Sequence, residues 1–361
     1  MKEITGIINE FNRLSKTATG LALATVIDIK GSSYRRTGAR MLIQDNGIYS
    51  GGISGGCIEG NALKKANLAI TNNEAIEVTY DTSNDDEAQI GVSLGCNGII
   101  TVLIAPVNTA DKYNPVEPLI ACTAAREPNI LITVLAVAHD QDIKCGQVYR
   151  FTSNEELVNF IGKGHALASV TDDVQQALTN GKSIIKSYGQ CKLFIEFIAP
   201  ATQIIIMGGN YDVYPLLKVT HNLGWLSVVV ANPKRLANDI HQLADHVVRD
   251  FDDVSVDKYT VGIIMSHDYN ADLKNLEKAL SSGLSYIGLL GPAIRKDEML
   301  AELDIQIDQG QSDRIFGPAG LDIGASQPEE IAISIVSEVL SVMRERSGSS
   351  LKNRQGPIYN R

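Results

Sequence analysis

The sequence predicts an α/β protein with a mixed α/β N-terminal domain and a C-terminal domain built on a mainly parallel sheet. At 361 residues the chain is too long for a typical single domain and suits two. Strand-like segments show no regular alternation with helices up to Pro200, after which short apolar strands and amphipathic helices alternate. This alternation is typical of a parallel sheet covered by helices on both faces. We therefore predict domains at residues 1–198 and 199–346 and a polar tail at 347–361.

Composition indicates a soluble globular protein with a mainly aliphatic core. Hydrophobic residues make up 44% of the chain, charged residues 20% and aromatic residues only 6%. The formal net charge of -10 argues against nucleic acid and anionic membranes as partners. No apolar run approaches the roughly 18 residues of a membrane-spanning helix, and residues 1–16 lack the apolar core of a signal peptide. We expect a cytoplasmic location.

The predicted strands of the first domain are rich in β-branched residues and bounded by Gly, Asn or Asp. They cover residues 20–31, 39–45, 47–52, 74–80, 97–106, 129–140 and 191–200. Asn46 and Gly47 form the residue pair favoured in two-residue hairpins, so a hairpin is expected there. Residues 1–16 have helical apolar spacing, and residues 58–72 consist of good helix formers.

The predicted strands of the second domain are short and apolar, with helical segments between them. They cover residues 203–210, 225–232, 244–248, 260–265 and 284–291. The first strand runs into Gly208 and Gly209 and is followed by a helix, which is the context of a phosphate-binding turn. Backbone N–H groups and the helix dipole would favour an anion at such a turn.

This glycine turn departs from the G-x-G-x-x-G pattern of Rossmann folds. Gly208 matches the first position, but Asn210 and Val213 replace the other two glycines. The second strand ends in Asn232, where a dinucleotide site would offer a carboxylate to the ribose. Two interpretations therefore stay open, NAD(P) binding and a purely structural tight turn.

Further polar residues follow later strands of this domain. His267 and Asp268 come directly after one strand, and ligands of open α/β sheets collect beyond the carboxyl ends of strands. Alternatively, Asp268 caps the next helix while His267 packs. Gly291 and Arg295 lie at the start of another predicted helix.

In the first domain, an arginine-bearing loop follows Gly31. Arg35, Arg36 and Arg40 lie close together in the sequence, and guanidinium groups bind phosphate and other oxyanions bidentately. Surface arginines are common, so an ordinary solvated loop is the alternative.

A second glycine-rich loop places Gly55, Gly56 and Cys57 just before a predicted helix. A helix N-terminus favours the thiolate form of a cysteine, so Cys57 is a candidate reactive group. The alternative is a small buried cysteine beside a tight turn. Glu59 has a structural reason to lie in a first helical turn, because a carboxylate there complements the helix dipole.

The cysteines predict neither a disulfide framework nor a zinc site, because they form an odd, dispersed set without a C-x-x-C pair. They are Cys57, Cys96, Cys122, Cys145 and Cys191. We predict no metal site of the protein's own. Gly95 and Cys96 form a third glycine-containing turn.

Taken together and in this order, the motifs resemble the XdhC/CoxI family of xanthine dehydrogenase accessory factors. The resemblance spans roughly residues 10–345. It is carried by GSSYRRTGARM, SGGCIEG, YDTSNDDE, LGCNG, GGNYDVYP, SHDY, YIGLLG and GLDIGASQPEEIA. It implies an α/β N-terminal domain and a Rossmann-like C-terminal domain.

The resemblance also implies a chaperone in the maturation of molybdenum hydroxylases, more than a turnover enzyme. Such a protein binds the molybdenum cofactor (molybdopterin), assists its sulfuration together with a cysteine desulfurase, and delivers it to the apoenzyme. Cys57 would lie near the molybdenum or the transferred sulfur, and Cys57 and His267 are the catalytic candidates. The expected cofactor-binding residues are Gly31, Arg35, Arg36, Arg40, Gly55, Gly56, Cys57, Glu59, Gly95, Cys96, Gly208, Gly209, His267, Asp268, Gly291 and Arg295.

Three positions depart from the family pattern. Tyr34 stands where proline is usual, Asn210 replaces a glycine, and Asn232 replaces an acidic residue. The last two argue against NAD(P) binding in the second domain. Two functions of other classes stay open, an NAD(P)-dependent oxidoreductase with His267 as acid or base and a protein-binding adaptor. A homodimer is expected.

Overall fold

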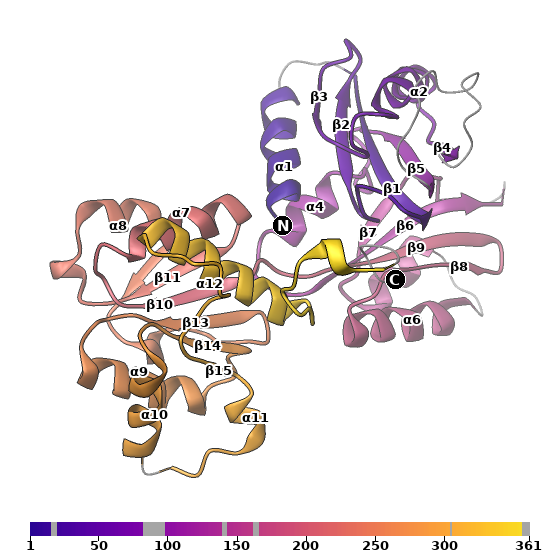
Figure 1. The fold of residues 1–361 in the computed structure, drawn as a ribbon. Coiled ribbons are helices and arrows are strands. Elements are labelled where there is room, and N and C mark those ends of the chain that lie inside the picture. The colour runs from indigo at the N-terminus through magenta and orange to yellow at the C-terminus, as the bar shows by residue number, and fades with distance from the viewer. Residues whose placement is uncertain (16–19, 82–97, 139–142, 162–165, 304, 356–361) are drawn as a thin grey trace. The chain divides into compact units, whose positions relative to one another are not determined.

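The structure is a computed structural model that describes residues 1–15, 20–81, 98–138, 143–161, 166–303 and 305–355. Contacts within the chain divide it into two compact units, with unit 1 comprising Met1–Pro200 together with Gln355 and unit 2 running from Ala201 to Arg354. Figure 1 labels the helices and strands of both units. Within the described ranges, no helix is both long and apolar enough to cross a membrane.

The described part of unit 1 contains a five-stranded antiparallel sheet in the order β3-β2-β1-β5-β4. Its elements are α1 (Lys2–Leu14), β1 (Leu21–Gly31), β2 (Arg40–Gln44), β3 (Tyr49–Gly51), α2 (Glu59–Asn72), β4 (Ile76–Asp81) and β5 (Gly98–Pro106). A hairpin forms at the predicted place, because β2 and β3 pair. Its turn is longer than the two-residue turn that the Asn-Gly pair favours, since Gln44 N donates to the Ile48 carbonyl oxygen at 2.8 Å and Gly47 has a positive φ of 83°. Helix α2 packs alanines 62, 66 and 69 on one face of the sheet.

A second antiparallel sheet of unit 1, with four strands among the described residues, has the order β7-β6-β9-β8. Its elements are α4 (Glu117–Cys122), β6 (Asn129–Val137), β7 (Val148–Arg150), α5 (Asn154–Ile161), α6 (Ala166–Asn180), β8 (Ile184–Tyr188) and β9 (Cys191–Ile198). Strands β6 and β9 were expected from the sequence, but the two helices between them were not. Val170 and Val174 of α6 are buried in the same core as Ile132 and Ile195 of this sheet.

Apolar side chains join the two sheets of unit 1. Ile27 and Leu103 of the first sheet form one buried cluster with Leu135 and Phe194 of the second. Between these sheets lies an ion pair, in which Arg40 Nη2 donates to Glu196 Oε2 and the two side chains are only 5% and 6% exposed. Since both charges have left water, each depends on the other for its stability.

Unit 2 is a Rossmann-like sheet whose six described strands are all parallel, in the order β12-β11-β10-β13-β14-β15. Its elements are β10 (Gln203–Met207), α7 (Val213–Leu223), β11 (Leu226–Val230), η1 (Pro233–Arg235), α8 (Asn238–Leu243), β12 (His246–Val248), η2 (Phe251–Asp253), β13 (Thr260–Ile264), α9 (Tyr269–Ser281), β14 (Tyr286–Leu289), α10 (Ala293–Glu302), α11 (Gln309–Ser312), β15 (Ile315–Phe316), α12 (Pro328–Met343) and η3 (Leu351–Asn353). Numbered along the unit, the strands follow the order 3-2-1-4-5-6 that is typical of dinucleotide-binding folds. The predicted fold class is confirmed.

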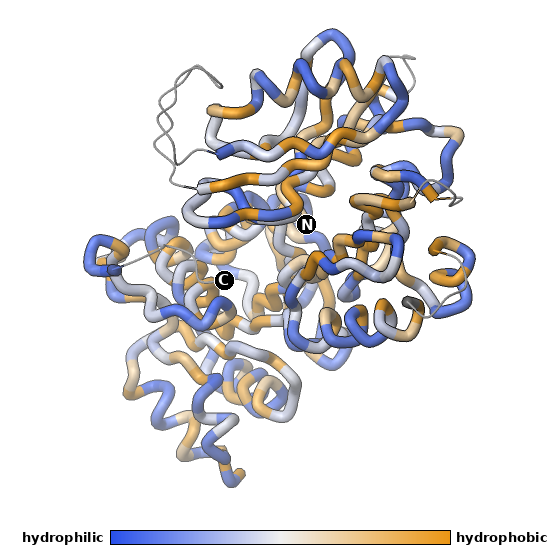
Figure 2. Tube along the Cα trace, turned by 90° about the vertical axis from the view of Figure 1, so that its right-hand side faces the viewer, coloured by the Kyte–Doolittle hydropathy of each residue, from blue (hydrophilic) through white to orange (hydrophobic). Residues whose placement is uncertain are grey.

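Helices cover both faces of this sheet. Successive residues of the central strand β10 point to opposite faces, and both sets of side chains are buried. Ile204 and Ile206 are buried in a cluster with residues of α7 and α12, whereas Ile205 and Met207 are buried with residues of α9 and α10. Figure 2 shows the corresponding alternation of hydrophobic and hydrophilic residues along the helical turns. The near-continuous apolar strands therefore reflect a sheet that is buried on both sides.

We predict that Glu196→Leu lowers the free energy of unfolding by about 3–5 kcal/mol, because Arg40 would stay buried without its carboxylate. The matched control is Glu77→Leu. Glu77 pairs with Lys192 at 3.9 Å between the same two sheets, but both side chains are exposed, so the loss there should stay within about 1 kcal/mol. Chemical denaturation measures both variants. Equal losses in the two variants would contradict the role of the buried pair, and Arg40→Met combined with Glu196→Leu should recover most of the stability.

Candidate functional site

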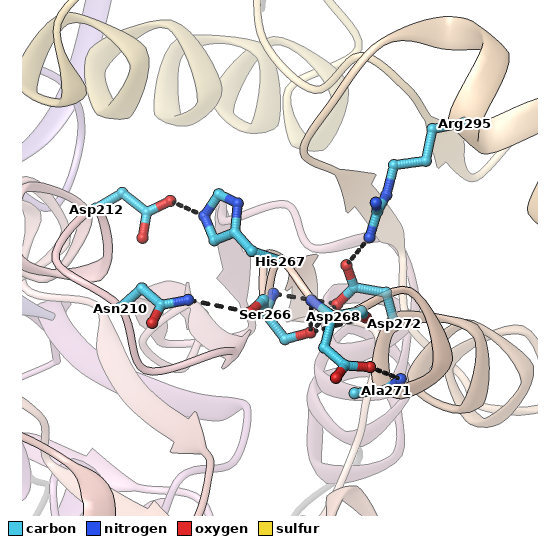
Figure 3. A network of polar contacts seen from close by, with 8 residues as sticks. All are labelled: Asn210, Asp212, Ser266, His267, Asp268, Ala271, Asp272 and Arg295. Atoms are coloured by element: carbon cyan, nitrogen blue, oxygen red, sulfur yellow. Dashed lines mark hydrogen bonds and ion pairs between the residues drawn. The ribbon is translucent and has the colours of Figure 1, made fainter.

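Two loops meet at the carboxyl edge of the unit 2 sheet, one after β10 and one after β13. These strands are neighbours at the point where the strand order reverses, which is where open α/β sheets bind ligands. A side-chain carbon at Gly208 would lie 2.4 Å from the Met265 carbonyl oxygen, so only glycine fits between the loops. Asn210 Nδ2 donates to the Ser266 carbonyl oxygen at 3.0 Å and ties the loops together (Figure 3).

His267 and Asp212 form an imidazole–carboxylate pair across these loops. His267 Nε2 lies 2.6 Å from Asp212 Oδ2, with the imidazole 54% exposed and the carboxylate 13% exposed (Figure 3). Asp212 Oδ1 is buried and has no hydrogen-bond partner among the described residues. With Nε2 held by the carboxylate, Nδ1 is the ring nitrogen that could exchange a proton with a ligand.

The backbone of His267 is held in a strained conformation by its neighbours. Its φ is 61°, in the left-handed region that non-glycine residues rarely adopt. On one side, Ser266 donates through N and Oγ to Asp272 Oδ1, at 3.1 and 2.5 Å. On the other side, Asp268 Oδ1 accepts from Ala271 N at 2.9 Å. The network therefore fixes the direction of the imidazole, as is common at functional sites.

Asp268, Arg295 and Gly209 have structural partners in unit 2. Asp268 caps α9, which is the structural alternative that the sequence left open. Arg295 Nη2 donates to the buried carboxylate of Asp272 at 2.8 Å and lies over the Tyr269 ring. A side-chain carbon at Gly209 would lie 2.3 Å from Leu236, so this glycine permits close packing. Gly291 has a positive φ of 119° at the turn before α10.

The residues of the β10 turn do not fit the pyrophosphate of a dinucleotide. The Asp212 carboxylate lies at the N-terminus of α7, where the dipole would otherwise stabilise a phosphate. Asn210 is bonded to the β13 loop, and the Asn232 side chain accepts from Lys234 N at 3.1 Å. Asn232 also leaves the ribose position without the usual carboxylate. We therefore assign no NAD(P) chemistry to unit 2.

In unit 1, the loop before α2 is organised around the Ser54 hydroxyl. Ser54 Oγ accepts from the backbone N–H groups of Gly56 and Cys57 at 3.1 Å and of Ile58 at 3.4 Å. It donates in turn to the buried carboxylate of Glu59, which also accepts from Ser54 N at 2.8 Å. The N–H groups of Gly56, Cys57 and Ile58 are thus already bonded within the loop, and Glu59 holds the loop together.

Cys57 is half-buried in this loop, with Sγ 3.6 Å from Ser54 Oγ. The arginine loop docks against the same segment, because Arg35 Nε donates to the Gly52 carbonyl oxygen at 3.1 Å and Arg35 Nη2 pairs with Glu3. Arg36 is exposed. Among the described residues, no three His, Cys, Asp or Glu side chains are placed to hold a metal ion.

Comparison with known proteins identifies the family. A family model described as the XdhC Rossmann domain matches residues 204–339, and a model of the XdhC and CoxI family matches residues 15–81. The two matches together span more than half of the chain. The chain belongs to the XdhC/CoxI family. The resemblance seen in the sequence motifs is confirmed.

Relatives of this XdhC/CoxI protein are similar over most of their length. A protein of Bacillus subtilis (strain 168), named as a probable xanthine dehydrogenase subunit, is 26% identical over 331 residues, covering 89% of this chain and 93% of that protein. The molybdenum cofactor insertion chaperone PaoD of Escherichia coli K12 is 21% identical over 324 residues, covering 90% and 83%. A Bacillus halodurans crystal structure described as a xanthine dehydrogenase matches with a TM-score of 0.71 and 26% identity, over 95% of this chain and 98% of that one.

The structure separates the three arginines of the XdhC/CoxI loop. Arg40 is buried against Glu196, and its Nη1 donates to the Gly38 carbonyl oxygen at 2.7 Å, so its guanidinium does not face a ligand at the surface. Gly31 ends β1 with a positive φ of 85°. Gly95 and Cys96 lie outside the described residues, so their predicted role stays a prediction.

Sequence reasoning missed the groups that organise both sites. They are Ser54, Glu196, Asp212, Ser266 and Asp272. Ser54, Asp212 and Ser266 each lie inside one of the quoted motifs, but no pattern in the sequence marks a serine as the centre of a loop or an aspartate as the partner of a distant histidine. Only the folded chain brings Asp212 and His267, 55 residues apart, within hydrogen-bond distance.

We predict that Ser54→Ala lowers the free energy of unfolding by about 1–3 kcal/mol, because three backbone N–H groups would lose their acceptor and the buried Glu59 would lose one of its two donors in residue 54. Ser33→Ala is the matched control. Ser33 Oγ is buried and lacks a partner among the described residues, so its removal should be neutral or stabilising. Thermal and denaturant unfolding measure both variants, and a loss of stability in Ser33→Ala alone would contradict this account.

We also predict that brief iodoacetamide treatment at pH 8 alkylates Cys57 before the other described cysteines. Burial raises the pKa of the Cys122 and Cys145 thiols to about 11, and burial also raises the pKa of Cys191. These thiols are therefore held protonated and react slowly. Peptide mass spectrometry measures the order of labelling, with the denatured protein as the control for complete reaction. Faster labelling of Cys122 than of Cys57 would contradict the prediction.

Proposed function

We propose that this protein is a maturation factor for a molybdenum hydroxylase, binding the molybdenum cofactor and assisting its insertion into the apoenzyme. The observation that carries the proposal is the similarity to a molybdenum cofactor insertion chaperone, which covers 90% of this chain and 83% of that protein. The similarity to a probable xanthine dehydrogenase subunit over 93% of its length points to the same class of client.

We place the cofactor site in unit 1, at the loop that carries Cys57. A thiol is a soft donor that suits a metal with sulfur ligands, and the half-buried Cys57 is held on an ordered backbone. The exposed Arg36 supplies a guanidinium for a phosphate. These residues fit a cofactor with a metal, sulfur ligands and a phosphate. When bound, the cofactor supplies the redox chemistry of the client enzyme, and the residues of this chain hold and shield it.

The proposal extends to the sulfuration of the cofactor. In this proposal a cysteine desulfurase is the sulfur donor, Cys57 lies near the transferred sulfur, and the protein acts in the cytoplasm as a homodimer. The function is that of a chaperone and not of a turnover enzyme. The Asp212–His267 pair of unit 2 is equipped for proton transfer, but the unfavourable fit of its turn to a pyrophosphate gives no support to an NAD(P)-dependent oxidoreductase.

The test is purification from cells that make molybdopterin, followed by measurement of bound molybdenum and pterin and of client activation. We expect molybdenum and pterin to co-purify with the wild-type protein. Cys57→Ala should reduce the affinity for the cofactor at least tenfold, which corresponds to about 1.4 kcal/mol of binding free energy. Cys145→Ala is the matched control, because Cys145 is also half-buried but donates to the Leu135 carbonyl oxygen in another part of unit 1. Absence of co-purification together with no saturable binding of added cofactor would disprove the proposal.

A further inference from the structure

We propose that Tyr34 is the stacking surface for the pterin ring of the cofactor. This inference rests on the proposed function and adds to it the part of the ligand that one residue recognises. Tyr34 is 70% exposed, so most of its aromatic ring faces solvent. Single exposed aromatic residues are common on protein surfaces, so the assignment depends on what surrounds the ring.

The ring of Tyr34 is held against the loop that carries Cys57. A side-chain carbon built on Gly55 would lie 3.6 Å from Tyr34 Cγ and 3.7 Å from Cδ1, so the ring lies beside the side-chain position of this glycine. The next residue, Arg35, anchors the segment through Gly52 and Glu3. Because Arg35 is hydrogen-bonded and Gly55 lies in the loop that Ser54 organises, a ligand that stacks on the ring would not have to order these segments. The entropic cost of binding is therefore low.

Space is available at the side-chain position of Gly56, the residue between Gly55 and Cys57. Gly56 has a positive φ of 112°, and no atom lies within 4 Å of the position where its side chain would begin. Gly56 separates Gly55, which contacts the ring, from Cys57. A flat ligand could therefore approach the backbone at Gly56, next to the glycine that lies beside the Tyr34 ring and next to Cys57 in the sequence.

The chemistry of this surface favours a flat ring over an anion. The N–H groups of Gly56, Cys57 and Ile58 already donate to Ser54 Oγ, and the guanidinium of Arg35 is paired with Glu3. What Tyr34 adds is an exposed π-face. Stacking of a heteroaromatic base on such a face is worth about 1–3 kcal/mol, as measured by alanine substitution. A pterin, which is a planar heteroaromatic bicycle, meets the same requirement.

The experiment compares Tyr34→Ala, Tyr34→Phe and Tyr211→Ala with the wild type. Tyr211 is 73% exposed in unit 2 and serves as the matched control for the loss of an exposed tyrosine. Each variant is titrated with molybdopterin and with 6-hydroxymethylpterin, which has the ring but no phosphate, dithiolene or metal. Circular dichroism and thermal unfolding verify that the variants are folded.

We expect Tyr34→Ala to weaken the binding of both ligands by about 5- to 150-fold. Tyr34→Phe, which keeps the π-face, should bind within about twofold of the wild type, and so should Tyr211→Ala. The inference is overturned, while the proposed function stands, if the wild type binds molybdopterin and Tyr34→Ala binds it equally well. It is likewise overturned if Tyr34→Ala lowers only client activation, since Tyr34 would then contact the client. Absence of molybdopterin binding by the wild type overturns both.

Discussion

Arg40 and Glu196 meet between the two sheets of unit 1, where neither charge has access to bulk water. The contact links β2 to β9. A series of further hydrogen bonds connects Arg40 to the arginine loop. The backbone N–H of Arg40 donates to Glu3 at 2.7 Å, Glu3 pairs with Arg35, and Arg35 donates to the carbonyl oxygen of Gly52. A single chain of charge-assisted hydrogen bonds thus connects the centre of the unit with the start of the Cys57 loop. Loss of the buried pair should therefore disturb the candidate site as well as the packing.

These hydrogen bonds change the role of the arginine-rich motif. The guanidinium groups of Arg35 and Arg40 are bonded inside the protein, and the N–H groups of Gly56 and Cys57 in the following loop are bonded to Ser54. A loop so fully hydrogen-bonded is ordered before any ligand arrives, which lowers the entropic cost of binding. The groups that it presents are a thiol and the face of Tyr34. A cofactor with a metal, sulfur ligands and a flat ring matches such a surface better than a simple oxyanion does.

In unit 2, too, the loops of the candidate site are held by hydrogen bonds within the protein, here at the edge of a Rossmann-like sheet. The strand order and the glycine at the first turn are those of a nucleotide-binding fold, but an aspartate lies at the start of α7 and pairs with a strained histidine. Ser266 N donates to Asp272 and Asp268 Oδ1 accepts from Ala271 N, and these two hydrogen bonds fix the backbone on both sides of His267. The fold thus supplies the place for a ligand, whereas the side chains at that place decide its chemistry.

The sequence by itself determined the fold class, most strands, the Asn46–Gly47 hairpin and the family, because these depend on local periodicity, turn chemistry and motif order. It also located the loops at which both sites lie. Only the tertiary structure decided which charges meet. Arg40 was a candidate for ligand binding until folding placed it against Glu196, 156 residues away. Hydrophobic patterns report whether a residue is buried, but they carry no information about the distant group that neutralises it, and that partner decides whether an arginine binds a ligand or supports the core.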